Sequence, residues 1–209
     1  MHPKAIRRLP AAILAAVFVM SGRSAARAFS DGPPDGFCGN PPAMNNCTLC
    51  HLDYPLNSGN GSLELLNAPD AFVPGQLYDL VVRLADPGQN RWGFQLTVLG
   101  PGNQQAGLLT VTDAVRTQLS DNPGTMPDFL MHTAPGTQEG TPNGPVTWSF
   151  QWTAPDVTSV TFYVAGNAAD GTFDPGQDYI YTTALSIDQG IVAVEERTWG
   201  TIKSLYRRR

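Results

Sequence analysis

Two cysteines and a histidine in the stretch NNCTLCHLDY, residues 45–54, have the types and spacing that could do chemistry. Cys47 and Cys50 are separated by two residues, and His51 follows directly. This spacing has three chemical interpretations: covalent haem attachment, half of a tetrahedral zinc site, and a redox dithiol. In haem attachment, the two thiols form thioethers with the two vinyl groups and the histidine ligates the iron.

The zinc and dithiol interpretations lack supporting residues. A structural zinc site needs four ligands, and beyond the motif only Cys38 and a distant histidine are available. A thioredoxin-like dithiol opens a helix within a strand–helix–strand unit, whereas the flanks of this motif are rich in turn-forming residues. The sequence therefore favours one covalently attached haem c on Cys47 and Cys50, with zinc and a disulfide or dithiol left as alternatives.

The iron of such a haem has a second axial position, for which the chain offers few ligands. Besides His51 there are only two histidines, and His2 lies in the first 28 residues. His132, in FLMHTAPGT, is the predicted second ligand; Met131 is a weaker alternative, and Met126 and Met44 are others. With both axial positions filled by protein, the haem passes single electrons. An open sixth position permits peroxidase-like or gas-sensing chemistry.

Residues 1–28 have the features of a signal peptide: a basic start, an apolar core and small residues before a predicted cleavage after Ala28. The mature protein is therefore expected in the periplasm, at the cell surface or secreted. Removal of the signal peptide leaves 8 basic and 18 acidic residues, a formal charge of −10, which disfavours nucleic acid as a partner. No later apolar run reaches the length of a transmembrane span. Thiols normally form disulfides in an oxidising compartment. If Cys47 and Cys50 bind haem, Cys38 has no cysteine left to pair with.

Two-residue alternation of apolar and polar side chains predicts strands through the middle of the chain. The segments are LYDLVVRLA (77–85), RWGFQLTVL (91–99), an edge strand in AGLLTVTD (106–113), VTWSFQWTA (146–154), SVTFYVAGN (159–167) and DYIYTTALSI (178–187). Their apolar faces place Trp92, Trp148 and Trp152 in the core. This pattern predicts an all-β fold, an antiparallel β-sandwich.

The predicted organisation has four parts. Residues 1–28 are the signal peptide, residues 29–74 an irregular segment with the cysteine motif, residues 75–188 the sandwich, and residues 189–209 a C-terminal tail. The irregular segment is rich in Gly, Pro and Asn, so it needs a staple outside itself. The tail is expected to be a frayed terminus, a short helix or a docking signal.

Several of these segments, in the same order, resemble the bacterial choice-of-anchor V domain, which is related to the reelin-like (Reeler) domain. They are DGPPDGFCGNPPAMNNCTLCH, RWGFQLTVL, MHTAPGT, VTWSFQWTAP, VTFYVAGNAADG and DYIYTTALSI, and together they cover residues 31–187. The resemblance implies an exported, immunoglobulin-like β-sandwich preceded by a segment with a cysteine–cysteine–histidine motif. It also favours His132 as a ligand. Cys38 departs from the family pattern, and so does the tail, which lacks a spanning helix.

Other motifs give weaker support for a functional site. Asp170, Asp174 and Asp178 do not follow the spacing of a calcium loop and are interpreted as an ordinary acidic turn. Asn46 and Asn60 begin glycosylation-type triplets without further support. Nothing resembles a nucleophile elbow or a glycosidase carboxylate pair.

Two hypotheses of different classes follow. The first is an exported monohaem c-type cytochrome domain that relays single electrons to a redox partner of unknown identity. The second is a surface binding or adhesion module, in which the motif only staples the irregular segment. A haem enzyme with an open site is a third, weaker hypothesis.

Overall fold

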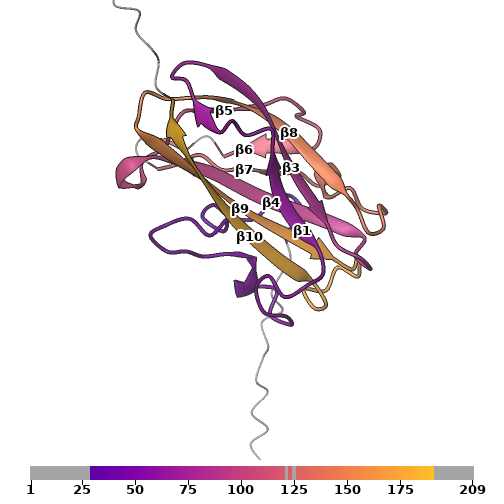
Figure 1. The fold of residues 1–209 in the computed structure, drawn as a ribbon. Helices are drawn as coiled ribbons and strands as arrows, with labels where there is room; N and C mark the ends of the chain where they lie inside the picture. Colours follow the sequence, from indigo (N-terminus) through magenta and orange to yellow (C-terminus); the bar gives the residue numbers. More distant parts are fainter. Residues whose placement is uncertain (1–28, 121, 124–125, 191–209) are drawn as a thin grey trace, which may run out of the picture.

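Alternating side chains produce strands where the sequence predicts them, and these strands form two packed sheets (Figure 1). The computed structural model describes residues 29–120, 122–123 and 126–190. The four-stranded sheet has the order β1 (Ser62–Leu66), β3 (Leu77–Ala85), β8 (Val146–Thr153) and β5 (Leu108–Val111). Its members are antiparallel, and β5 lies at the predicted edge.

The six-stranded sheet faces the first sheet across the core. Its order is β2 (Ala71–Phe72), β10 (Tyr179–Gln189), β9 (Ser159–Ala169), β4 (Arg91–Leu99), β7 (Leu130–His132) and β6 (Thr117–Leu119). Only the β2–β10 pair is parallel among these neighbours. Three short 3₁₀ helices, η1 (Cys47–Leu49), η2 (Pro101–Asn103) and η3 (Pro135–Thr137), complete the elements of the described residues. The all-β sandwich prediction is confirmed.

Side chains from both sheets fill the space between them. The three predicted core tryptophans are buried, and each indole Nε1 donates a hydrogen bond to a backbone carbonyl: Trp92 to Thr141, Trp148 to Gly136 and Trp152 to Ala106. Because a buried indole N–H is costly without an acceptor, these bonds fix the orientation of the largest core side chains.

Two strands lie before the predicted start of the sandwich at residue 75. β1 and β2 fall within 29–74, which the sequence assigns to the irregular segment, and each is the edge strand of one sheet. β1 is only partly buried and β2 has two residues, so neither carries an alternation that is long enough to read. The predicted signal peptide lies outside the described residues, and so does the predicted tail from residue 191; its first residue, Gln189, is the last residue of β10. Among the residues that are described, none forms a helix with the length and hydropathy that a bilayer-spanning segment requires.

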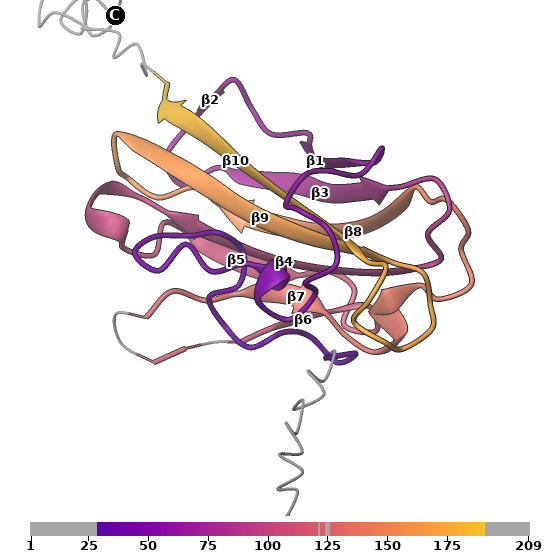
Figure 2. The ribbon, with the colours of Figure 1, turned by 90° about the horizontal axis from the view of Figure 1, so that it is seen from below.

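The chain before β1, residues 29–61, is called the leader below. Figure 2 shows the leader, in indigo, crossing the outer face of the six-stranded sheet over β4, β7 and β9. As a result β4 is buried on both faces from Trp92 to Leu99, whereas its sequence predicts a half-buried strand. On this outer face Gln95 contacts the leader, Gly93 faces the His132 ring, and the Thr97 hydroxyl donates to the Asp128 carbonyl.

One side chain on that outer face ties the leader to the sheet. Gln95 is fully buried; its Oε1 accepts a hydrogen bond from the Phe37 N–H at 2.6 Å, and its Nε2 donates to the Pro34 carbonyl at 2.9 Å. Around it, Cys38 packs with Phe129, Met131 and Ala165 in a small apolar cluster. This cluster and the two hydrogen bonds supply the staple that the irregular segment needs.

Replacing Gln95 with alanine is expected to loosen the leader without unfolding the sandwich. Loss of both bonds leaves a buried N–H and a buried carbonyl without partners, which lowers the free energy of leader opening by about 2 to 4 kcal/mol. Amide hydrogen exchange by mass spectrometry should show faster exchange in residues 30–52 and unchanged exchange in β3 and β8. Gln151→Ala, which removes a surface bond to Asp79, is the matched control. Equal leader protection in both variants would contradict this role.

Candidate functional site

The cysteine motif forms one tight turn at the surface of the leader. The Cys47 carbonyl accepts hydrogen bonds from the N–H groups of Cys50 and His51, at 3.1 and 3.0 Å, and residues 47–49 form η1. Asn46 caps this turn, because its Oδ1 accepts from the backbone N–H and the hydroxyl of Thr48. The glycosylation-type triplet at Asn46 therefore has a local structural role.

His51 is oriented by a carboxylate far along the chain. Its Nδ1 lies 2.6 Å from Oδ2 of Asp178, and both side chains are buried. With the carboxylate ionised, Nδ1 carries the proton and donates, so the lone pair of the imidazole is on Nε2. Asn167 Nδ2 lies 3.4 Å from that Nε2. A carboxylate on one ring nitrogen is a feature of metal-ligating histidines, whereas here the other nitrogen accepts a long hydrogen bond from Asn167.

His132 is oriented by the backbone. β7 pairs with β4 only at Leu130 and Met131. Beyond that pairing, the His132 imidazole contacts the backbone of Phe94 in β4. Its Nδ1 lies 3.1 Å from the Phe94 carbonyl oxygen and 3.0 Å from the Phe94 nitrogen. When Nδ1 donates to the carbonyl, the lone pair lies on Nε2. Burial lowers the pKa of His132, and hydrogen bonds to the backbone of Phe94 and Phe29 oppose that effect.

Gly93 makes room for this imidazole. A Cβ at position 93 would lie 2.8 Å from Cε1 and 3.2 Å from Nε2 of His132, closer than real Cβ contacts come. Glycine inside a strand often marks a close approach of another group, and here that group is the histidine ring.

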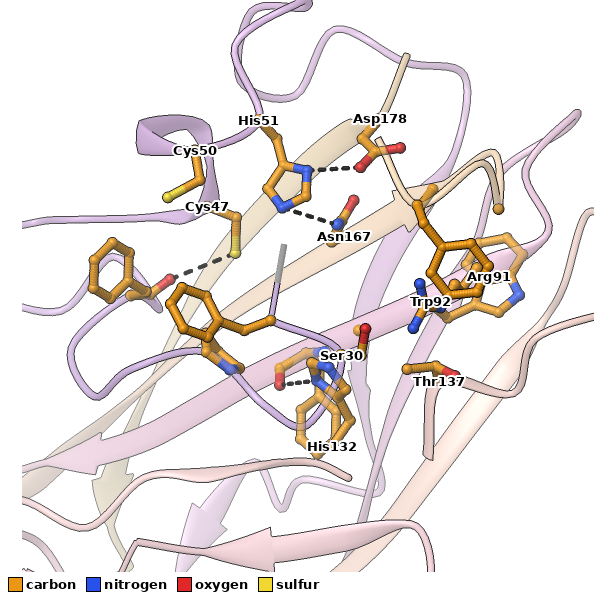
Figure 3. Close-up of a pocket in the computed structure, with 18 of the residues that line it drawn as sticks. Ser30, Cys47, Cys50, His51, Arg91, Trp92, His132, Thr137, Asn167 and Asp178 are labelled. Atoms are coloured by element: carbon orange, nitrogen blue, oxygen red, sulfur yellow. Dashed lines mark hydrogen bonds and ion pairs between the residues drawn. The ribbon is translucent and has the colours of Figure 1, made fainter. Parts of the chain in front are cut away.

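Cys47, Cys50, His51 and His132 line one small cavity, of about 90 Å³, that is partly open to solvent. The two histidines reach it from opposite sides, His51 from the leader and His132 from the end of β7 (Figure 3). The remaining walls are largely apolar and aromatic, from Phe29, Pro33, Pro34, Phe37, Trp92, Phe94 and Phe173.

The thiols do not have the properties of a redox dithiol. Burial raises the pKa of Cys47 to about 12, with a further contribution from the neighbouring Cys50. Reactive dithiols have lowered thiol pKa values, so the raised pKa of the half-buried Cys47 disfavours that interpretation. For zinc, no three histidine, cysteine or acidic side chains among the described residues lie close enough to hold one metal ion. Cys38 is buried away from the cavity, in the cluster with Met131, and burial raises its pKa as well.

The structure thus places the four predicted site residues around one cavity. The methionines that were alternative iron ligands lie elsewhere. Met131 packs in the cluster under the leader, and Met44 and Met126 are exposed; none of the three lines the cavity. The sequence interpretation missed Asp178, which it placed in an ordinary acidic turn. It also missed Gly93, although a glycine inside a strong strand pattern is a signal for close approach.

Comparisons with known proteins give only distant likenesses. No protein-family model matches the chain, and no curated protein matches it in sequence. The chain is similar to the reeler domain of human F-spondin (20% identity, TM-score 0.43, covering 65% of this chain and 94% of that one). It is also similar to the Reelin-N domain of F-spondin (20%, 0.45, 69% and 97%) and to a cohesin module from a Clostridium perfringens family 33 glycoside hydrolase (8%, 0.41, 63% and 96%). Likenesses this distant carry no information on function.

Gly93→Ala is expected to displace the His132 imidazole. The added methyl group overlaps the ring, so the variant should lose about 1 to 3 kcal/mol of stability and the His132 Cε1–H resonance should shift in NMR spectra. Gly100→Ala is the control, because a Cβ there meets its nearest atom at an ordinary 3.4 Å. An unmoved His132 resonance in Gly93→Ala would show that the ring does not lie against this glycine.

Proposed function

We propose that the chain is an exported c-type cytochrome domain that carries one covalently attached haem and passes single electrons. The observation that carries this proposal is the convergence of the two motif thiols, His51 and His132 on one cavity. His51 and His132 are 81 positions apart in the sequence, and neither needs the other for its local structure. The signal-peptide features support export.

The residues around the cavity fit the group. Cys47 and Cys50 would hold the porphyrin covalently, and His51 and His132 would ligate the iron from opposite sides through Nε2. In each imidazole Nδ1 has a hydrogen-bond partner, Asp178 for His51 and the backbone of Phe94 for His132, and binding of iron would displace the long Asn167 contact from Nε2 of His51. The aromatic and proline side chains of the walls suit a flat apolar macrocycle.

When bound, a haem with two axial histidines supplies a one-electron couple and no open coordination position. The protein residues do the rest. Asp178 keeps the proton on Nδ1 of His51, and its negative charge makes the imidazole a stronger donor. Leu49 and Leu52, beside the motif, are 57% and 74% exposed, so the thiol side of the cavity lies near the surface where a redox partner could approach.

A surface binding module is the second candidate function. The observation in its favour is that protein contacts, through Gln95 and the Cys38 cluster, hold the leader on the sheet. Electron exchange with a small donor protein, followed by stopped-flow spectroscopy, separates the two functions, since a display module has no reason to exchange electrons rapidly.

The cysteine motif is expected to carry the haem, which intact-mass measurement tests directly. Protein produced with a haem-maturation system should have the mass of the polypeptide plus one haem and give the pyridine haemochrome band of a thioether-linked haem. Replacing both Cys47 and Cys50 with alanine should abolish covalent attachment completely. Cys38→Ala is the matched control and should keep the full haem mass, because Cys38 lies outside the cavity. A wild-type protein with the bare polypeptide mass would refute the proposed function.

His132→Ala is expected to convert the ferric haem from six-coordinate low-spin to high-spin. The variant removes one axial ligand and leaves His51 in place, so the change should be complete at neutral pH in the visible spectrum. Met131→Leu is the control, since this side chain packs under the leader. If the wild type is already high-spin and binds carbon monoxide or cyanide without losing a ligand, the sixth position is open, and the haem-enzyme hypothesis replaces electron relay.

A further inference from the structure

Cys38 and Cys47 meet the same apolar cluster beneath the leader. Cys38 is a member of that cluster, and the partly buried Cys47 packs against it. The leader brings the two residues together by folding back on itself. Cys38 and Asn46 form an antiparallel backbone bridge, and the Gly39 N–H donates to the Asn45 carbonyl at 2.7 Å. Cys47 therefore directly follows the residue that faces Cys38.

The two motif sulfurs point in different directions. Figure 3 shows the Cys47 sulfur turned toward a backbone carbonyl, that of Phe37 at 3.9 Å, and the Cys50 sulfur turned away from Cys47. Phe37 directly precedes Cys38, so the Cys47 sulfur points at the part of the leader that carries Cys38. Burial raises the pKa of Cys38, and the charge of a Cys47 thiolate raises it further, an effect that acts only between nearby groups.

We propose that Cys38 and Cys47 form a disulfide in the exported chain before haem is attached. The compartment that the signal-peptide features predict favours disulfides over free thiols. A disulfide requires two neighbouring backbone positions whose side chains face a common space, and the backbone bridge and the shared cluster provide both. The bond closes the folded-back part of the leader, residues 38–47, and adds a covalent staple to the contacts of the Cys38 cluster.

The bond forms by exchange with an external disulfide, such as oxidised glutathione or the disulfide of an oxidoreductase. The Cys47 thiolate attacks the external disulfide, forms a mixed disulfide and releases one thiol. The Cys38 sulfur then loses its proton, attacks the Cys47 sulfur and releases the second thiol. Two protein thiols are oxidised, and one external disulfide is reduced to two thiols. Because burial raises the pKa of both cysteines, their thiolates are poor leaving groups, and the finished bond resists reduction.

This disulfide and haem attachment exclude each other, a consequence that rests on the proposed function. The Cys47 sulfur cannot form a thioether with a vinyl group while it is bonded to Cys38. Haem attachment then requires prior reduction of the bond by a dithiol, whereas Cys50 stays available throughout. Cys38 thus controls when the haem can be attached, although it lies outside the cavity.

The test is thiol mapping of the full-length chain, exported from cells that lack a haem-maturation system and denatured with an alkylating reagent present. Before reduction only Cys50 should be alkylated, and after reduction with dithiothreitol all three cysteines should be. Chymotrypsin separates the three cysteines by cleaving after Phe37, Met44 and Leu49. Mass spectrometry without reductant should find residues 38–44 joined to residues 45–49. Three alkylated thiols, or residues 45–49 joined to the fragment that begins at Cys50, would overturn the proposal.

Two variants sharpen the result. Cys50→Ala should show no alkylated thiol before reduction, and two alkylated thiols would mean that Cys47 pairs with Cys50 instead. In cells with a haem-maturation system, Cys38→Ala should carry haem in a larger fraction of chains than the wild type. Met131→Leu is the matched control, because it alters the same cluster and keeps the thiol. Equal haem fractions in all three proteins would overturn the control of attachment by Cys38.

The outcomes separate this inference from the proposed function. If haem is attached and the Cys38–Cys47 bond is never found, the inference falls and the cytochrome proposal stands. If the bond is found and the maturation system adds no haem even to Cys38→Ala, the cytochrome proposal falls and the disulfide stands as a staple of the leader.

Discussion

The two hydrogen bonds of the buried Gln95 side chain are the interaction on which the site depends. The leader has no strand or core of its own before β1, so its position is set by its contacts with the sheet. Gln95 meets a backbone donor and a backbone acceptor of the leader at once, and the cluster around Cys38 adds apolar area beside it. The leader covers the outer face of β4. The cysteine motif therefore lies over the six-stranded sheet, which also carries His132.

The two imidazoles of the site are held from outside the cavity by different acceptors. Asp178 offers His51 a carboxylate, whereas Phe94 offers His132 a neutral backbone carbonyl. The two candidate ligands therefore differ in the charge of the group that orients each ring. Arg91 adds a positive charge on a third side, which lowers the pKa of His132 further. The two imidazoles therefore have different electrostatic surroundings, with a carboxylate beside His51 and a guanidinium group acting on His132.

Local patterns predicted the sandwich because most of its strands show the alternation of apolar and polar side chains in consecutive residues. β3 and β8 alternate as the sequence indicates, and the edge position of β5 also followed from its short pattern. The contact between His51 and Asp178 spans 127 positions and leaves no local trace, so the aspartate was taken for part of a turn. Burial of both faces of β4 was missed for the same reason, since an irregular leader gives no periodicity to show where it docks. The motif and His132 were found by residue chemistry, which does not require that contact to be known.

The cavity and the core share part of their walls. Trp92 and Phe94 belong to the main apolar cluster between the sheets and also line the cavity, and Phe94 holds His132 through its backbone. A wall made of close-packed core residues has little freedom to move. On the proposed function this rigidity matters, because ligands that keep their positions when the iron changes oxidation state favour rapid electron exchange. The sandwich therefore does more than carry the leader: its packing limits how far one of the two imidazoles can shift.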